Sequence, residues 1–172
     1  MVWAWGGPAV ASQTDPRLDA LFASLRGARS SLEAGPLSQE IWDIWYQTDN
    51  PAAARHLAEG VEAMNAGSAG QALEAFNAVI ASAPHFAEGW NRRATLYYLI
   101  GDFEASIADI DKTLALEPRH FGALSGLALI REAQHKWFEA LEALDKVSRI
   151  HPKMPQLEER LQQLSNQLGQ TI

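Results

Sequence analysis

The chain has 172 residues, enough for one domain with a buried core, and its 47% content of hydrophobic residues excludes a disordered protein. The formal net charge is −7 without a cluster of Lys and Arg, which argues against a nucleic-acid partner, and the absence of cysteine excludes disulfides and thiolate metal sites. No apolar run approaches the roughly 20 residues that a membrane-spanning helix needs, and no segment alternates with the period of a strand, so we expect an all-α fold.

Residues 1–14 are expected to form a flexible N-terminal segment, and residues 15–52 a degenerate helical hairpin. Each helix of the hairpin has an apolar stripe, formed by Leu18, Leu21, Phe22 and Leu25 in the first and by Ile41, Trp42 and Trp45 in the second. We place the break between the two helices at Gly35-Pro36. The hairpin would then be an irregular row in front of the repeats that follow.

Proline recurs at positions 84, 118 and 152, and glycine recurs at 67 and 101 with the same interval of 34 residues. A period of this length is typical of a solenoid of helix-turn-helix repeats, in which each repeat covers the apolar face of its neighbour. We therefore divide residues 53–154 into three repeats, 53–86, 87–120 and 121–154. The prolines would end the second helix of each repeat.

The repeats also have local start and stop signals. Asn50 is expected to be an N-cap, and Ser68 to open a capping box with Gln71. Gly101-Asp102 would end one helix and cap the next, whereas His135 stands at the matching glycine position of the third repeat.

Several positions of the three rows resemble the tetratricopeptide repeat family, whose pattern is W-x2-L-G-x2-Y, then A-x3-F, then P. They are Gly60, Ala72, Phe76 and Pro84 in the first row, Trp90, Tyr97 and Pro118 in the second, and Leu127, Ala140, Leu144 and Pro152 in the third. The chain departs from the pattern at His56, Arg93, Ala94 and Arg131. The resemblance implies a right-handed α-solenoid of helix pairs that binds other proteins and catalyses no reaction.

Residues 155–172 are expected to form a C-terminal capping helix. Its apolar stripe consists of Leu157, Leu161, Leu164 and Leu168, with charged and amide residues outside it. A helix with one apolar face suits the end of an open solenoid, because the last hydrophobic face needs a cover.

The N-terminal residues have two interpretations. Ala9-Val10-Ala11-Ser12 resembles the cleavage region of a secretory signal peptide, although the basic start and the apolar run of such a peptide are missing. Residues 15–22 are similar to the start of the mature part of periplasmic bacterial members of the same repeat family. We therefore predict a periplasmic location, and a cytoplasmic protein with a flexible tail is the alternative.

No motif in the sequence predicts an enzyme. Nucleophile elbow, phosphate loop and dinucleotide fingerprint are absent. The five histidines, at 56, 85, 120, 135 and 151, never stand four residues apart on one helix as metal ligands would. We therefore expect no catalysis, no metal and no cofactor.

Two sets of residues fit a packing role. Gly122 and Gly126 are expected to allow close helix packing, and a shallow notch for a partner is the alternative. The tryptophans at 42, 45, 90 and 137 take pattern positions, so we expect them in the core.

The family resemblance also implies a binding site, because the first helix of each pair lines a concave groove in tetratricopeptide proteins. The corresponding positions are Leu57, Val61, Met64, Glu88, Asn91, Arg92, Thr95, Tyr98, Ser125 and Leu129, with Gly122 beside them. This groove would hold an extended or helical peptide with hydrophobic anchors and an acidic group for Arg92. The carboxylate clamp of chaperone-binding members is absent, because its other places hold Leu57, Val61, Gly122 and Gly126.

We therefore predict an adaptor that binds a segment of a partner protein in this groove. A structural subunit that docks through its ends or its convex face is the alternative. The N-terminal segment of the chain itself, with Trp3 and Trp5, could also fill the groove. The sequence predicts no particular oligomeric state.

Overall fold

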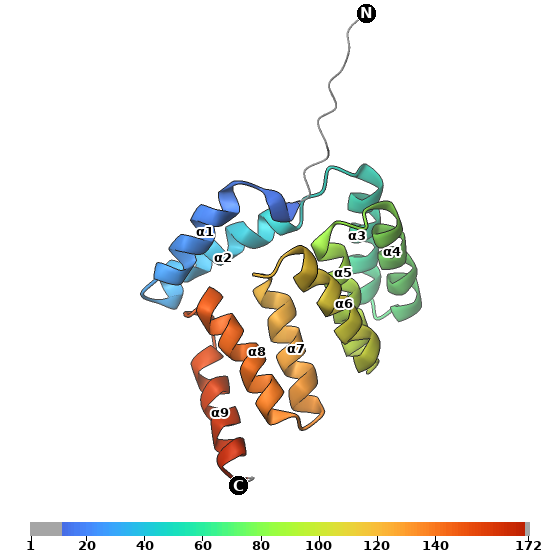
Figure 1. The fold of residues 1–172 in the computed structure, drawn as a ribbon. Helices are drawn as coiled ribbons and strands as arrows, with labels where there is room; N and C mark the ends of the chain where they lie inside the picture. Colours follow the sequence, from blue (N-terminus) through green and yellow to red (C-terminus); the bar gives the residue numbers. More distant parts are fainter. Residues whose placement is uncertain (1–11, 171–172) are drawn as a thin grey trace, which may run out of the picture.

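The computed structural model describes residues 12–170, and within them the chain forms a short 3₁₀ helix and nine α-helices with no strand (Figure 1). The elements are η1 (Ser12–Thr14), α1 (Arg17–Gly27), α2 (Ser31–Trp45), α3 (Pro51–Asn65), α4 (Ala69–Ser82), α5 (Ala87–Leu99), α6 (Phe103–Leu116), α7 (Phe121–Ala133), α8 (Trp137–Ile150) and α9 (Leu157–Gln170). The all-α prediction is confirmed. The signal-peptide-like residues and the two N-terminal tryptophans lie outside the described residues, so the periplasmic location stays a prediction.

Helices α3 to α8 form three antiparallel pairs, α3/α4, α5/α6 and α7/α8, which lie side by side in Figure 1. The second helices end at Ser82, Leu116 and Ile150, each two residues before a repeat proline. The 34-residue period of the sequence is therefore the period of the helices. Prolines end the helices as expected, because a proline inside a helix would remove a backbone donor and clash with the preceding turn.

Local caps explain where most of these helices begin and end. The side chain of Asn50 accepts hydrogen bonds from the backbone N–H groups of Ala52 and Ala53, as expected for an N-cap. Gly67, Gly101 and His135 have positive φ angles of 73°, 81° and 57° at matching places of the three repeats. The capping box at Ser68 is wrong, because that residue is the N-cap of α4 but its side chain makes no capping hydrogen bond.

The predicted break at Gly35-Pro36 is wrong, because both residues lie inside α2 and the chain turns before Ser31. Ser30 caps α2 by accepting a hydrogen bond from the backbone N–H of Glu33, whose carboxylate accepts one from the backbone N–H of Arg29. Pro36 removes the helical partner of the Leu32 carbonyl. Leu32 is 85% exposed, so water can reach that group and the helix continues.

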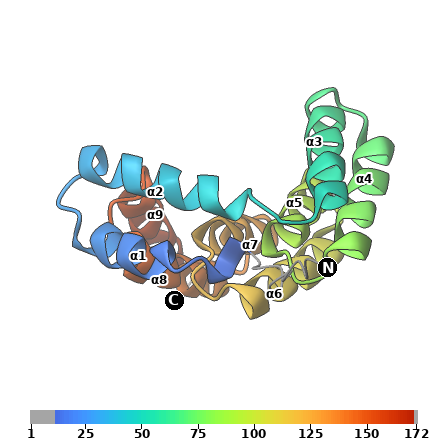
Figure 2. The ribbon, with the colours of Figure 1, turned by 90° about the horizontal axis from the view of Figure 1, so that it is seen from above.

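The α1/α2 hairpin does not continue the stack in front of α3. It packs against α7 and α8, and Leu18, Phe22 and Trp45 share one buried core with Phe121 and Leu144. Figure 2 shows α1 beside α8, and α2 running from there toward the start of α3. The separate core between α3, α4 and α5 contains no residue of the hairpin. One face of α7 is therefore covered by the hairpin.

Helix α9 covers the other end of the solenoid by packing against α8. Leu157 and Leu164 of the predicted leucine stripe are buried in the same core as the hairpin, and Leu161 packs against it half-buried. An ion pair between Arg160 and Glu132 also joins α9 to α7.

Candidate functional site

A pocket of about 280 Å³ opens between α5 and α7, and we call it the α5–α7 pocket. Its lining residues are Asn91, Ala94, Thr95, Tyr98 and Leu99 of α5, Ser106 and Ile110 of α6, and Gly122, Ala123, Ser125, Gly126 and Leu129 of α7. We call the face shared by α3, α5 and α7 the groove face. No charged residue lines the pocket, in a chain whose net charge is −7.

Three hydroxyl groups of the α5–α7 pocket already have partners within the protein. The hydroxyl of Thr95 donates to the Asn91 carbonyl at 2.9 Å, and the hydroxyl of Ser106 donates to the Ala94 carbonyl at 2.7 Å. The hydroxyl of Ser125 donates at 2.8 Å to the carbonyl one turn before it on α7. Because these donors are committed within the protein, the pocket offers a ligand mainly apolar contact.

Gly122 and Gly126 stand one turn apart on α7 and differ in what surrounds them. A Cβ atom at Gly122 would lie 2.6 Å from the ring of Trp42, so that glycine allows α2 to pack closely. A Cβ atom at Gly126 would meet only the end of Ile110, at 3.8 Å. The expected packing role therefore holds for Gly122 through α2. The environment of Gly126 instead matches the alternative of a notch in the groove face.

The first turns of α5 and α7 hold a buried cluster of Glu88, Asn91, Arg92 and His120. The Glu88 carboxylate accepts hydrogen bonds from Arg92 Nε at 2.6 Å, from Asn91 Nδ2 at 2.9 Å and from His120 Nε2 at 3.1 Å. His120 Nδ1 accepts the backbone N–H of Ala123, which leaves Nε2 as the ring nitrogen that faces Glu88. Burial raises the pKa of Glu88, and the hydrogen bond from His120 acts in the opposite direction.

Aromatic residues at the end of α2 cover this cluster. Trp45 stacks on the His120 ring with centroids 4.1 Å apart, and the Tyr46 ring lies 4.6 Å from the guanidinium carbon of Arg92. Arg92 is therefore held between Glu88 and Tyr46. The expected role of Arg92 in binding an acidic group of a partner does not fit this geometry.

The groove face thus has two ends. We call the first turns of α5 and α7, residues 88–92 and 120–122, the covered end, because α2 packs over them. We call residues 94–99 and 123–129 the open end, which supplies most of the α5 and α7 residues that line the α5–α7 pocket, whereas Asn91 and Gly122 border the pocket from the covered end. The open end exposes Leu99 by 61% and Leu129 by 38%.

The structure brings together half of the ten residues predicted for the groove. Asn91, Thr95, Tyr98, Ser125 and Leu129 line the α5–α7 pocket. Glu88 and Arg92 lie in the buried cluster instead, and Glu88 is 0% exposed. Leu57 is buried in the α3/α4 core, against which Val61 and Met64 pack half-buried.

Sequence reasoning missed Leu99 and Ile100, which are exposed by 61% and 51%. Together with Met64, Gly67, Ala69 and Leu96 they line a second pocket of about 190 Å³, which we call the α3–α5 pocket. The signal was present in the sequence, because Leu99-Ile100 is an apolar pair directly before the turn glycine Gly101. Such a pair at a helix end has no core position to occupy.

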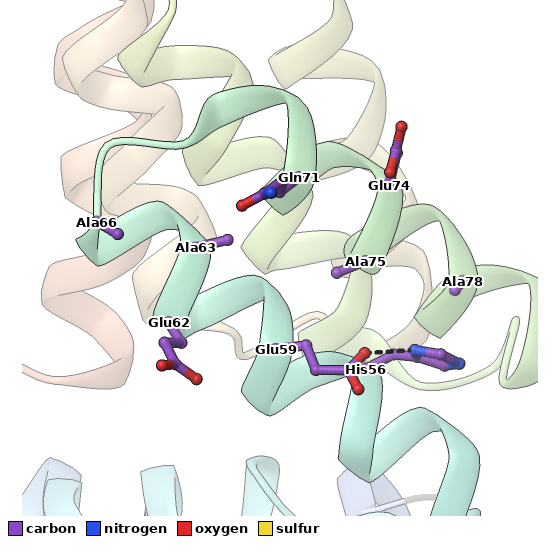
Figure 3. Close-up of a pocket in the computed structure, with 9 residues that line it drawn as sticks. All are labelled: His56, Glu59, Glu62, Ala63, Ala66, Gln71, Glu74, Ala75 and Ala78. Carbon is purple, nitrogen blue, oxygen red and sulfur yellow. Dashed lines mark hydrogen bonds and ion pairs between the residues drawn. The ribbon is translucent and has the colours of Figure 1, made fainter.

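A wide hollow of about 530 Å³ lies between α3 and α4, and we call it the outer hollow (Figure 3). Its floor consists of alanines, and its rim holds His56, Glu59, Glu62 and Glu74. His56 Nδ1 lies 2.8 Å from the Glu59 carboxylate, whereas Glu62 and Glu74 point in different directions in Figure 3. Among residues 12–170, no group of three or more His, Cys, Asp or Glu side chains is placed to hold a metal ion. None of the described helices is long and apolar enough to cross a membrane.

The sequence profile of the tetratricopeptide repeat family matches residues 57–112 and 96–155, so the chain belongs to that family. The chain is 32% identical over 158 residues to a TPR repeat-containing protein of Rhizobium etli. This alignment covers 92% of this chain and 78% of the relative. It is 34% identical over 112 residues to a tetratricopeptide repeat protein 36 homolog of Nematostella vectensis, covering 62% of this chain and 59% of the relative.

Solved structures show the same fold. The first TPR of Spaghetti (RPAP3), bound to the HSP90 peptide SRMEEVD, matches 70% of this chain and 96% of its own with a TM-score of 0.67 and 21% identity. The TPR2B domain of yeast Sti1 in complex with pHsp70 matches 70% of this chain and 98% of its own with a TM-score of 0.62 and 25% identity. MamA matches 89% of this chain and 76% of its own with a TM-score of 0.63 and 18% identity.

Proposed function

We propose that this protein is a non-catalytic adaptor that binds a segment of a partner protein at the open end of its groove face. Membership of the tetratricopeptide repeat family supports this proposal. So do the two similar structures that hold peptides of HSP90 and Hsp70. The partner itself is defined by the chemistry of the pocket in this chain.

The observation that carries the proposal is the open, uncharged α5–α7 pocket with large apolar side chains at its rim. Leu99 and Leu129 expose apolar surface to water, which costs about 25 cal/mol for each Å² left uncovered. A partner that covers these side chains and enters the pocket removes that surface from water.

The buried cluster supports a non-catalytic role. Glu88 and His120 form a carboxylate–imidazole pair of the kind that some enzymes use, but both residues are 0% exposed. Trp45 covers the imidazole, and Arg92 and Asn91 occupy the carboxylate. A substrate has no path to either group, so we assign the pair a structural role.

The test is a glycine substitution that fills the pocket. Gly126→Leu adds a side chain at the α5–α7 pocket, where Ile110 at 3.8 Å is the one side chain within 4 Å of an added Cβ. Gly70→Leu is the control, because Gly70 is an exposed helical glycine with no atom within 4 Å of an added Cβ. Both variants and the wild type are used as bait in an extract of the organism that encodes the protein. We expect proteins that bind the wild type and Gly70→Leu to be lost with Gly126→Leu. Identical sets of bound proteins for all three would contradict groove binding.

The outer hollow favours a second candidate function, in which the protein is a structural subunit that docks through its α3/α4 end. In a solenoid the outer face of the α3/α4 pair would pack against a preceding repeat. Here the α1/α2 hairpin packs against α7 and α8 instead. Ala75→Arg would project a long charged side chain into the outer hollow. Loss of a bound protein with Ala75→Arg, but not with Gly126→Leu, would favour this second function over the first.

A further inference from the structure

We infer that the partner segment is an internal amphipathic helix with two apolar anchors seven residues apart, and not an acidic C-terminal tail. This inference rests on the proposed function, since it takes the groove face as the binding surface. It specifies which chemistry that surface selects.

Two apolar hollows meet at one residue. Leu99 lines both the α5–α7 pocket and the α3–α5 pocket, which have volumes of about 280 Å³ and 190 Å³. It is 61% exposed, so it forms a ridge with a hollow on either side. Neither hollow is lined by a charged residue. A partner that covers Leu99 can therefore place one apolar side chain in each hollow.

The spacing of the hollows fixes the spacing of the anchors. One hollow lies between α5 and α7 and the other between α3/α4 and α5, so they are separated by about one interhelical distance, roughly 10 Å. In an α-helix, residues i and i+7 are about 10.5 Å apart and lie on the same face. An amphipathic helix with anchors at these positions fits both hollows.

The hydrogen bonds of the pocket favour a helix over an extended peptide. An extended segment brings unpaired backbone N–H and C=O groups, which need partners when they are buried. The hydroxyls of Thr95, Ser106 and Ser125 already donate to carbonyls of the protein. A helix satisfies its own backbone groups, so it can be buried at this surface without leaving them unpaired.

Neither pocket offers a cation to a C-terminal carboxylate. Arg92, the one cation among the predicted groove residues, is held by Glu88 and covered by Tyr46. At Gly122, another position of the chaperone-type clamp, the Trp42 ring occupies the space that a clamp side chain would need. A carboxylate in the groove would lose its water without gaining a cation, which is strongly unfavourable.

The test uses two yeast-displayed libraries of random segments of roughly 16 residues, a little over four helical turns. One library is fused at both ends, so that it has no free terminus, and the other ends in a free carboxylate. Both are selected against the full chain, and the selected segments are then measured on Gly126→Leu and Gly70→Leu. We expect enrichment of apolar residues at i and i+7 in the doubly fused library. Affinity should fall at least about tenfold on Gly126→Leu and stay unchanged on Gly70→Leu.

Other outcomes overturn the inference in distinguishable ways. Enrichment only of acidic segments with a free carboxylate would overturn the helix but leave the groove as the site. Segments rich in proline would show that the partner is extended. Segments that bind Gly126→Leu as well as the wild type, or no enrichment in either library, would overturn the proposed function too. Enrichment only after deletion of residues 1–11 would overturn the inference for the full chain, because that part of the chain would then occupy the groove.

Discussion

The two ends of the groove face are built on the same two helices, α5 and α7, and differ in what covers them. At the covered end, Trp42, Trp45 and Tyr46 pack over the buried cluster of Glu88, Arg92 and His120. At the open end, small and hydroxyl side chains surround a pocket whose rim is exposed leucine. The hairpin therefore determines which part of the groove face remains for a partner, and the two ends should respond differently to mutation.

The largest effect is expected at the covered end, from Trp45→Ala. Trp45 is 1% exposed and contacts the rings of Phe22, Trp42, His120 and Phe121. Its removal leaves a cavity between the hairpin and α7, and we expect the free energy of unfolding to fall by about 3–5 kcal/mol. Urea denaturation measures this loss.

Leu32→Ala is the control for Trp45→Ala, since Leu32 lies on the same helix and is 85% exposed. Its expected change in the free energy of unfolding is within about 0.5 kcal/mol. Equal effects of the two substitutions would mean that α2 does not pack on the repeats as described.

A smaller loss is expected from Gly122→Ala, also at the covered end. The new methyl group would meet the ring of Trp42 at 2.6 Å, so α2 must shift. We expect the free energy of unfolding to fall by about 1–3 kcal/mol, as for other overpacked sites. Thermal or urea unfolding checks it, and a gain in stability would contradict the close packing of Trp42.

Gly126→Ala, one turn further along α7, should have the opposite sign. Its methyl group would lie 3.8 Å from Ile110, which is ordinary contact. Replacing glycine by alanine inside a helix stabilises by about 0.5–1 kcal/mol, because the unfolded chain loses freedom. The same unfolding measurement applies. A loss of stability would show that the notch is packed and not open.

The last expected effect is a pH dependence of stability that comes from one buried histidine, His151. His151 is buried edge-on to Phe121 with ring centroids 5.3 Å apart, and burial lowers the pKa of His151. Below its ordinary pKa of about 6.5, the unfolded chain binds a proton that the folded chain does not. The contribution of His151 to stability is therefore complete above about pH 6.5 and is lost as the pH falls toward the lowered value.

His151→Phe should flatten this part of the pH profile. The raised pKa of Glu88 has the opposite effect, because the contribution of Glu88 to stability is lost as the pH rises. Comparing the wild type with His151→Phe removes this shared effect of Glu88. Urea unfolding at pH 7 and pH 5.5 measures the difference, which one proton limits to about 1.4 kcal/mol per pH unit. Parallel profiles would contradict the burial of a neutral His151.

The regular part of the fold could be predicted because its signals are local. Asn50 caps the helix that begins at the next residue, and the repeat prolines end helices two residues earlier. Each of these rules acts over a few residues. The period then adds the information that the same local structure occurs three times.

The placement of the hairpin could not be predicted in this way. Trp45 stacks on His120, which lies 75 positions further along the chain, and no periodicity connects the two. The same contact explains why Glu88 is buried although its position in the repeat predicts the groove. Trp90 was expected in the core but is half-buried, with its indole N–H donating to the Pro84 carbonyl, so its truncation should cost less than that of Trp45.

Photo-crosslinking tests the central claim that a partner binds at the open end of the groove face. The photoreactive p-benzoylphenylalanine replaces Leu129 at the open end or, as the control, Phe138 on α8, which is 60% exposed and outside the groove. We predict that irradiation in cells attaches a partner protein through position 129 and not through position 138. Attachment through position 138 alone would contradict the account, because the partner would then bind away from the groove face.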